Sequence, residues 1–388
     1  MGTTRKRPSS DAITAVKEET LEQCPDCGNP VNPSASTRER IIIDMQLPQK
    51  PEVTKHMIHQ YWCGTCGAMK EKAVVDALPG FVTGLKTVMY SAYQHYHLGL
   101  SISKIIDTLS IHGIRITAGA LVGGWHGLAQ LFRPLYEEIG DIIRSCQDAV
   151  YADETSARQN GKKHWLWSFS TKKEALFVIR KSRGGNIVRE ILGTVFPGIL
   201  VTDFWKPYLA VRAFLRQWCV AHLLREFKKI EYARSDLPDE YWLFRKKVKR
   251  LFHDALRESK KKTPITDRQA AYRRFLKRLD EITAGVYHDS DVLRLVKRLK
   301  KYRDGFFTFV VKDVDATNNH AERIIRYAVI MRKTSFHTMS EKGSETMSVL
   351  MSVFKTLELR NADVFQEALA LAQKAIAYRK LSKNHLAA

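Results

Sequence analysis

The chain has 388 residues, of which 44% are hydrophobic and 10% aromatic, so it can form two or three domains with a sizeable core. This composition excludes a wholly disordered or fibrous protein. The 63 Lys and Arg residues outnumber the 41 Asp and Glu residues and give a formal charge of +22. A polyanion is therefore the expected partner, nucleic acid first and an anionic membrane surface second. No apolar run is long enough to predict a transmembrane helix, and the polar N-terminus predicts no secretory signal.

Two Cys-x-x-Cys pairs follow a mixed-charge segment, residues 1–20, which we expect to be a flexible tail. The pairs are Cys24 with Cys27 and Cys63 with Cys66, and each is followed by a glycine that lets the chain fold back. Without an export signal, such pairs indicate metal binding rather than disulfides. Four thiolates form a closed tetrahedral site, so we expect one structural zinc ion in a ribbon over residues 21–75. The alternative is four buried or redox-active cysteines, and the partner of this domain is either DNA or another protomer.

Residues 80–145 have a helical pattern. We predict helices over 82–98, from the cap Ser101 to residue 112, and from the cap Thr117 onward. Three short helices with a glycine-containing turn are compatible with a helix-turn-helix DNA-binding domain, and equally with plain helical packing.

From residue 147 the pattern changes to an α/β layout. Short β-type runs are expected over 149–153, 164–170, 175–180 and 198–203, with a helix over 184–193. Beyond residue 305, FFTFVV at 306–311 resembles a strand, and helices are expected from about residue 317 to 381.

Residues 220–305 are expected to be almost entirely helical and strongly basic. Between Arg225 and Asp304 the chain has 24 Lys or Arg and 13 Asp or Glu, an excess of +11. An excess of one sign favours a track for nucleic-acid phosphates, and the alternative is a solvated helical face.

Three acidic residues are candidates for a metal site. Asp153 and Asp203 each end an apolar β-type run, and Glu322 lies in the first turns of a predicted helix. Hard cations prefer oxygen ligands, and two magnesium ions about 3.5–4 Å apart need shared carboxylates. The residues alone leave open that these are ordinary surface carboxylates.

Two further patterns lie near these carboxylates. Cys219 and His222 share one helix face, and we interpret them as packing and hydrogen-bonding residues rather than zinc ligands. Glu322, Arg326 and Lys333 also share one face, which suits a phosphate beside a metal or, alternatively, an ordinary intrahelical ion pair.

Several segments together resemble transposases of the insertion sequence 66 family. They are the stretch from Asp153-Glu-Thr-Ser to Trp167, Leu200-Val-Thr-Asp203-Phe-Trp-Lys-Pro-Tyr208, Gln217-Trp-Cys-Val-Ala-His222-Leu-Leu-Arg225-Glu, Asp315-Ala-Thr-Asn-Asn-His-Ala-Glu322-Arg with Arg332-Lys333, and the paired cysteine knuckles. The segments occur in the family's order and cover roughly residues 20–375. The chain differs in lacking a longer N-terminal leucine-zipper region and in having Ala316 where the family often has proline.

The resemblance implies a ribonuclease-H-like core whose catalytic triad is Asp153, Asp203 and Glu322, holding two Mg²⁺ or Mn²⁺ ions. It also implies that the basic helical stretch is an insertion within that core. The expected division is a tail at 1–20, a zinc domain at 21–75, a helical DNA-binding domain at 80–145, a catalytic domain at 146–224 and 306–388, and the insertion at 225–305.

The implied function is that of a DNA transposase, which frees a 3′-OH at each element end and joins it to target DNA. Expected partners are the terminal inverted repeats, target DNA, further copies of the chain, accessory proteins encoded by the element, and no membrane. The implied location is the cytoplasm of a prokaryote, at the nucleoid. Trp165 and Trp205 are expected to stack on bases near the cut, unless they are core aromatics, and Arg326 and Lys333 to contact DNA. The alternatives are a non-catalytic zinc-dependent DNA-binding protein, such as a repressor or domesticated transposase, and another nuclease of the same fold.

Overall fold

The computed structural model describes residues 16, 29–30, 50–65, 67–261, 263–335 and 338–383. The chain divides into two compact units, Met1–Glu52 and Val53–Ala388, and the elements below belong to the second. Almost all of the expected tail lies outside the described residues, as do Cys24, Cys27 and Cys66. The described part of the zinc segment includes a short antiparallel hairpin of β1 (Gln60–Cys63) and β2 (Ala68–Glu71).

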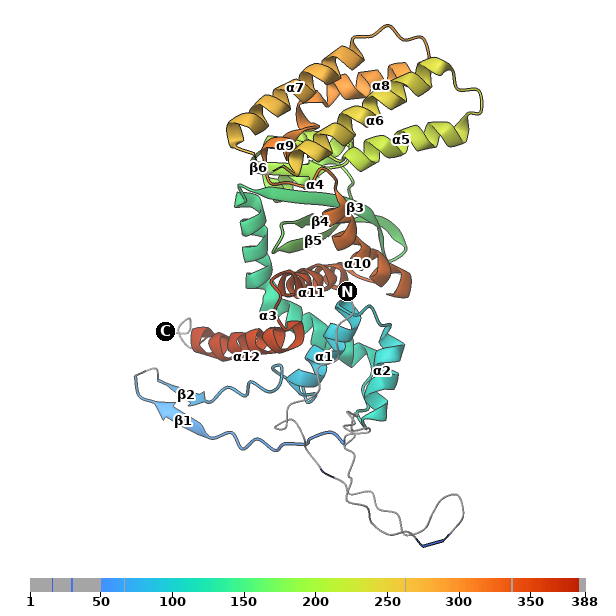
Figure 1. The fold of residues 1–388 in the computed structure, drawn as a ribbon. Helices are drawn as coiled ribbons and strands as arrows, with labels where there is room; N and C mark the ends of the chain where they lie inside the picture. The colour runs from blue at the N-terminus through green and yellow to red at the C-terminus, as the bar shows by residue number, and fades with distance from the viewer. Residues whose placement is uncertain are drawn as a thin grey trace. The chain divides into compact units, whose positions relative to one another are not determined.

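A five-stranded mixed sheet forms the centre of the second unit (Figure 1). Its strands are β3 (Ala149–Gln159), β4 (Lys162–Ser170), β5 (Ala175–Arg180), β6 (Val195–Thr202) and β7 (Arg212–Trp218), in the order β5-β4-β3-β6-β7. The strands β3, β4 and β5 pair antiparallel, whereas β6 runs parallel to both β3 and β7. Helix α4 (Gly185–Leu192) connects β5 to β6, and the 3-10 helix η2 (Lys206–Ala210) lies between β6 and β7.

The four expected strands are confirmed; β5 has the expected bounds, whereas β3, β4 and β6 differ in extent. β3 does not end at Asp153, because it continues to Gln159 as the long partner of β4. The strand β7 was not expected, since Arg212, Arg216 and Gln217 interrupt its apolar pattern. The prediction of a strand over FFTFVV is wrong: Thr308–Val311 is the short helix α9. Its apolar side chains are buried by packing against helices rather than by joining the sheet.

The helical segment before the sheet contains α1 (Leu85–Tyr96), α2 (Ile102–Ile111) and α3 (Ala118–Ser145). Ser101 and Thr117 cap α2 and α3 as expected, each accepting a backbone N–H three residues later. However, α3 is not short: it has 28 residues and packs against the sheet and against α11 (Glu341–Leu359). The segment therefore shares one hydrophobic cluster with the sheet.

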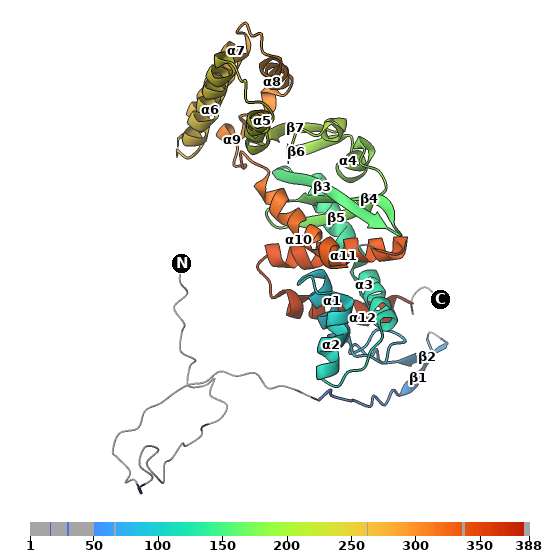
Figure 2. The same cartoon turned by 90° about the vertical axis from the view of Figure 1, so that its right-hand side faces the viewer.

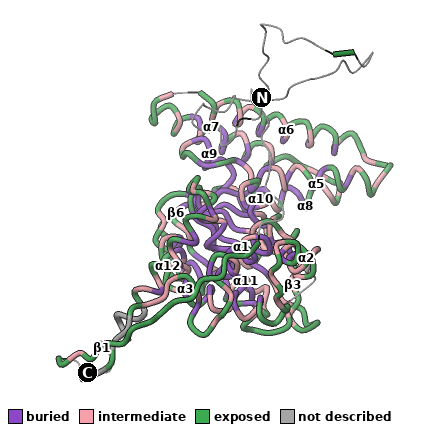
Figure 3. The backbone as a smooth tube through the Cα atoms, turned by 90° about the horizontal axis from the view of Figure 1, so that it is seen from below, coloured by how far each residue is buried: buried purple, intermediate pink, exposed green. Residues whose placement is uncertain are grey.

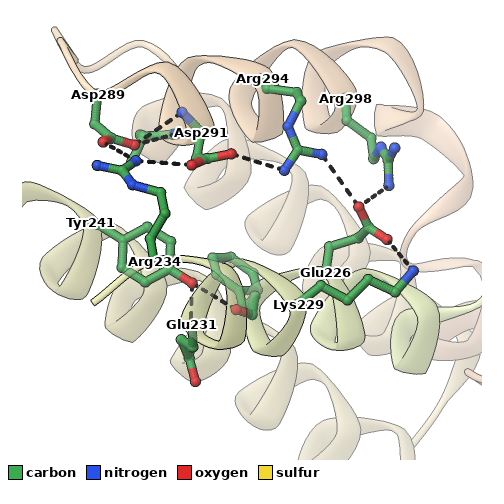
Figure 4. A network of polar contacts seen from close by, with 11 residues as sticks. Glu226, Lys229, Glu231, Arg234, Tyr241, Asp289, Asp291, Arg294 and Arg298 are labelled. Carbon is green, nitrogen blue, oxygen red and sulfur yellow. Dashed lines mark hydrogen bonds and ion pairs between the residues drawn. The ribbon is translucent and has the colours of Figure 1, made fainter. Parts of the chain in front are cut away.

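The basic stretch forms the helices α5 (Val220–Ala233), α6 (Asp239–Ser259), α7 (Ile265–Thr283) and α8 (Ser290–Lys301), which confirms its helical prediction. Ion pairs join α5 to α8, as Figure 4 shows. Arg234 after α5 contacts Asp289 at 2.8 Å and Asp291 at 2.9 Å, and Glu226 of α5 forms ion pairs with Arg294 and Arg298 of α8. Tyr241 of α6 donates to the carbonyl of Phe227 at 2.9 Å.

The two faces of the sheet are buried in different hydrophobic clusters, because alternate side chains of a strand point to opposite faces. Val150, Ala152 and Leu200 pack in the cluster that contains α1, α3 and α11. Ala149, Tyr151, Ile199 and Val201 pack in the cluster that contains α5 to α9. In Figure 2 these two helical layers lie on either side of the sheet, and Figure 3 shows the buried residues concentrated within them. The chain returns from the insertion through α10 (Asn319–Ser335) and α11 to α12 (Val364–Lys383).

Among the described helices, none is both long enough and apolar enough to span a membrane.

Candidate active site

The two aspartates lie side by side at the centre of the sheet. In the parallel ladder of β3 and β6, Tyr151 is opposite Val201, and each aspartate follows two residues later. Asp153 therefore shares a face with Tyr151, and Asp203, directly after β6, continues the face of Val201. This is the face covered by the basic helices. The sequence predicted that both aspartates lie at strand ends, and only Asp203 does. Asp153 lies within β3, just past the residues that pair with β6 and among those that pair with β4.

Glu322 is brought to the same place by the start of α10. Asn318, just before the helix, donates its side-chain amide to the carbonyl of Ala152 at 2.9 Å. The backbone N–H of Asn318 donates to Sγ of Cys219 at 3.1 Å, and the N–H of Cys219 donates to the carbonyl of Thr202. The residues that precede all three carboxylates are therefore tied to one another. Glu322 follows one turn into the helix, beside the buried Ala321.

The pKa of Asp153 reflects the charges of the nearby carboxylates. The pKa of Asp153 is raised to about 7, mainly by burial and also by the negative charges of Glu154, Asp203 and Glu322, while one backbone hydrogen bond from Glu154 acts to lower it. A buried carboxylate with this pKa holds a proton near neutral pH unless a cation compensates its charge. Several negative charges are therefore close together at this site, and a bound divalent cation would reduce the repulsion between them.

The carboxylate oxygens suit a hard cation such as Mg²⁺, and each of the three carboxylates already has a cationic or N–H partner, which for Asp153 is the backbone N–H of Glu154 at 2.9 Å. The backbone N–H of Trp205 donates to Asp203 at 2.8 Å. Arg225 of α5 donates to Glu322 at 2.6 Å, and Nδ1 of His222 lies 3.8 Å from the same glutamate oxygen. With these contacts in place, no three His, Cys, Asp or Glu side chains in the described ranges are gathered closely enough to hold a metal ion. Arg225 is thus the closest cationic partner of Glu322 among the described residues.

Cys219 and His222 lie at the start of α5, between the Asp203 segment and the Glu322 segment. Cys219 is fully buried, and burial raises the pKa of its thiol. Burial and the charge of Arg225 lower the pKa of His222, so its imidazole is neutral near pH 7. Nε2 of this ring lies 3.3 Å from Arg225. These contacts favour the packing and hydrogen-bonding roles expected from the sequence.

Sequence reasoning missed a buried carboxylate directly beside Asp153. Glu154 points to the opposite face of β3, where its side chain is 2% exposed. One of its oxygens accepts from Tyr208 at 2.5 Å, and the other accepts from Arg183 at 3.0 and 2.7 Å. The signal that could have identified Glu154 was its position next to Asp153 within an alternating strand. Nothing local in the sequence indicated Arg183, because 29 residues separate it from its partner.

The four predicted DNA-contact residues lie in two separate places. Trp165 and Trp205 both pack against the guanidinium of Arg183, at 4.3 and 3.9 Å from their ring centroids. Arg326 and Lys333 are exposed on α10, which persists through both positions and keeps them on the face of Glu322. No ion pair within the described part of the chain joins Arg326 to Glu322, whose cationic partner is Arg225. The neighbouring Arg332 instead bonds to Thr155 and Ser156 of β3.

Comparison with protein families gives two matches. Residues 81–346, more than half of the chain, match the model of the IS66 family of transposases. Residues 22–67, which contain all four cysteines of the two knuckles, match the zinc-finger binding domain of IS66 transposases. No curated protein matches the chain. The zinc-finger match supports zinc binding by the N-terminal segment. Together with the order of the acidic segments along the sheet, these matches show that the chain belongs to the IS66 transposase family.

Proposed function

We propose that the protein is a DNA transposase that cleaves the ends of its element and joins them to target DNA, using Asp153, Asp203 and Glu322. The observation that carries the proposal is geometric: the pairing of Tyr151 with Val201 aligns Asp153 with Asp203, and Asn318, just before the helix of Glu322, donates to Ala152 at 2.9 Å. The raised pKa of Asp153, to which burial contributes most and both other carboxylates contribute, supports it. The family match supports the general activity. Support for a ribonuclease-H-like core comes from the mixed sheet order β5-β4-β3-β6-β7 with one parallel pair on each side of β6.

The three carboxylates would hold the divalent cations, with Asp153 shared between them. Bound Mg²⁺ or Mn²⁺ supplies activation of an attacking oxygen and stabilisation of the leaving 3′ oxygen. The role of the protein is to fix the three carboxylates on separate elements of a buried site. The bonds from Asn318 to Ala152 and to Cys219 maintain this arrangement between strand and helix. Because the three groups suffice for activation, no serine or tyrosine nucleophile is assigned.

DNA would be held by basic side chains outside the triad. On the insertion, Lys246, Arg250 and Arg257 share one exposed face of α6, and none forms an ion pair with a described residue. Arg326 and Lys333 extend the positive charge along α10 from Glu322. We also propose that Cys24, Cys27, Cys63 and Cys66 hold a structural zinc ion, that residues 80–145 contribute to DNA binding, and that the active form is an oligomer on DNA.

The test is metal-dependent cleavage of a supercoiled plasmid that contains the sequences flanking the coding region. Wild-type protein should nick at the element ends with Mg²⁺ or Mn²⁺, and Asp203→Ala should abolish nicking without weakening DNA binding. Asp141→Ala, which removes an exposed carboxylate of α3, is the matched control and should cleave normally. Full cleavage by Asp203→Ala would overturn the triad. Binding without any cleavage by the wild type would favour the alternative of a DNA-binding protein without catalysis.

A further inference from the structure

Arg183 lies between two indole rings at the edge of the acidic site. Its guanidinium is 4.3 Å from the ring centroid of Trp165 and 3.9 Å from that of Trp205. Arginine packs readily on aromatic faces because its planar cation is weakly hydrated. The three side chains come from β4, from the loop before α4 and from the loop after β6, so the stack is a product of the tertiary fold.

The stack is fixed from behind by a buried ion pair. Both contacts of Arg183 to Glu154 are hydrogen bonds, at 3.0 and 2.7 Å, and the Glu154 side chain is 2% exposed. Tyr208, fully buried, holds the other oxygen of Glu154 at 2.5 Å. Two N–H groups of the Arg183 guanidinium thus donate to one oxygen of Glu154, and these charge-assisted bonds restrict its rotation. Trp205 therefore rests on a rigid support.

The outer surface of this stack faces solvent. Trp205 is 37% exposed, although Arg183 lies 3.9 Å from its ring centroid. By contrast, Trp167, two residues from Trp165 on the same strand, is completely buried and serves only the core. The backbone of Trp205 is also held beside Asp203, because its main-chain N–H donates a hydrogen bond to that carboxylate.

Two exposed lysines flank the stack. Lys163 lies 5.1 Å from the ring of Trp165, and Lys206 follows Trp205 directly. Both lysines are exposed and form no ion pair with any carboxylate that the structure describes. A flat aromatic face flanked by uncompensated cations suits an unpaired nucleotide, whose base stacks and whose phosphate is anionic.

We propose that Trp205, supported by Arg183 and Trp165, is a stacking site for one unpaired base of the DNA next to the cleaved position. This inference rests on the proposed function and specifies the state of its substrate: the duplex is open by at least one base at the active site. The occupant is a DNA base rather than a peptide, because both the ring and its charged neighbours match a nucleotide.

The first experiment measures binding without metal, so it does not depend on catalysis. Fluorescence anisotropy compares a 20-base-pair duplex with the same duplex containing one unpaired thymine. Wild-type protein should prefer the second. Trp205→Ala should lose this preference by roughly 5- to 150-fold, the range for loss of one base–aromatic stack, and Trp205→Phe should retain most of it. Trp242→Ala is the matched control, because Trp242 is 43% exposed and lies against Arg245 at 5.3 Å but belongs to α6.

The second experiment locates the contact. An unpaired 5-iodouracil in the same duplex should crosslink on irradiation to Trp205, as identified by mass spectrometry of the peptides. An unchanged preference in Trp205→Ala, or a crosslink only to the basic helices, would overturn the stacking site. Failure of the proposed function has a different signature: wild-type protein would keep its preference for the unpaired base but would not cleave DNA with any divalent metal.

Discussion

Asp153 is a buried carboxylate whose charge opposes folding of the metal-free protein. Its pKa is raised to about 7, mainly by burial and also by Glu154, Asp203 and Glu322, while an aspartate in the unfolded chain titrates near 3.8. Between these values the folded state binds the proton more tightly than the unfolded state. The stability that this group contributes to the metal-free protein therefore falls as pH rises from about 4 to about 7.

We expect Asp153→Asn to stabilise the metal-free protein at pH 8 by a few kcal/mol, because the amide has no charge to bury, and to change stability little at pH 4. Urea unfolding at the two pH values measures this difference. Asp107→Asn, at an exposed position of α2, is the control and should show no such pH dependence. A variant that is less stable than wild type at pH 8 would contradict the assigned cause.

Arg225 would compete with the proposed metal for Glu322, because it forms an ion pair with this carboxylate. The pair is 2.6 Å apart, and the two side chains are 47% and 35% exposed, so its net contribution to stability is small. Arg225→Gln should therefore leave folding almost unchanged but tighten Mn²⁺ binding by up to about fivefold, since the removed pair is worth at most about 1 kcal/mol. Isothermal titration with Mn²⁺ measures this. Weaker binding in the variant would mean that Arg225 instead orients Glu322 toward the metal.

At the scale of elements, two glycines of α3 allow neighbouring side chains to pack closely against the helix. From the sequence alone, glycine at these positions looked unfavourable for a helix. A Cβ added at Gly124 would lie 2.7 Å from Val88 of α1, and one at Gly127 would lie 2.9 Å from Leu78. Gly140, farther along the same helix, has open space around its Cβ position. Glycine in a helix costs stability, so it is retained where a neighbour requires the room.

We expect opposite effects of the same substitution at two positions of α3. Gly124→Ala should destabilise the protein by about 1–3 kcal/mol, because Val88 must move, whereas Gly140→Ala should stabilise it by up to about 1 kcal/mol. Thermal unfolding of both variants checks the pair. Equal effects in the two variants would show that helix propensity alone governs this helix.

The basic helices combine paired and unpaired cations. Arg234, Arg294 and Arg298 satisfy acidic partners within the insertion, so the net positive charge falls on other side chains such as Lys246, Arg250 and Arg257 of α6. This division separates cations that maintain the helical packing from cations that are available to phosphates.

Neutralising the exposed face of α6 should therefore weaken DNA binding without unfolding the insertion. In Lys246→Gln/Arg250→Gln/Arg257→Gln, the slope of log affinity against log salt should become shallower by roughly 0.9 for each lost phosphate contact. The control is Lys342→Gln/Lys374→Gln, at exposed positions of α11 and α12, which should keep the wild-type slope. An unchanged slope in the triple variant would indicate that this face is simply solvated.

At the scale of the whole second unit, one sheet supports two hydrophobic clusters. Adjacent residues of β3 and β6 alternate between the cluster of α1, α3 and α11 and the cluster of the insertion. Phe252 of α6 lies in the second cluster, fully buried, with ring centroids 5.5 and 5.3 Å from Phe306 and Phe307. Damage to the insertion should therefore reach the strands that hold the aspartates.

Phe252→Ala is expected to cost about 3–5 kcal/mol, as usual for a deleted core aromatic, and to raise hydrogen exchange in β3 and β6 as well as in α6. Hydrogen exchange with mass spectrometry resolves these segments. Val286→Ala, at a position that is 84% exposed, is the control and should leave all three unchanged. Faster exchange confined to the insertion would mean that it unfolds independently of the sheet.

The sequence by itself determined the family, the helical character of the basic stretch, four of the five strands of the sheet and the helix caps of α2 and α3, because these depend on local patterns of apolar, capping and motif residues. It also identified Asp153, Asp203 and Glu322 as candidates, although their roles stay predictions. FFTFVV was assigned wrongly, since an apolar β-rich run is compatible with any buried segment and its neighbours decide its conformation. The length of α3 and the strand β7 also depended on packing partners.

Only the tertiary structure decided which side chains meet. The parallel register of β3 and β6 aligns the two aspartates, and Asn318 joins their strand to the glutamate helix. Arg183 reaches Glu154 and both indoles from distant parts of the chain, and Arg225 reaches Glu322 across 97 residues. Charge–charge and stacking interactions act through space rather than along the chain, so no local pattern in the sequence could specify them.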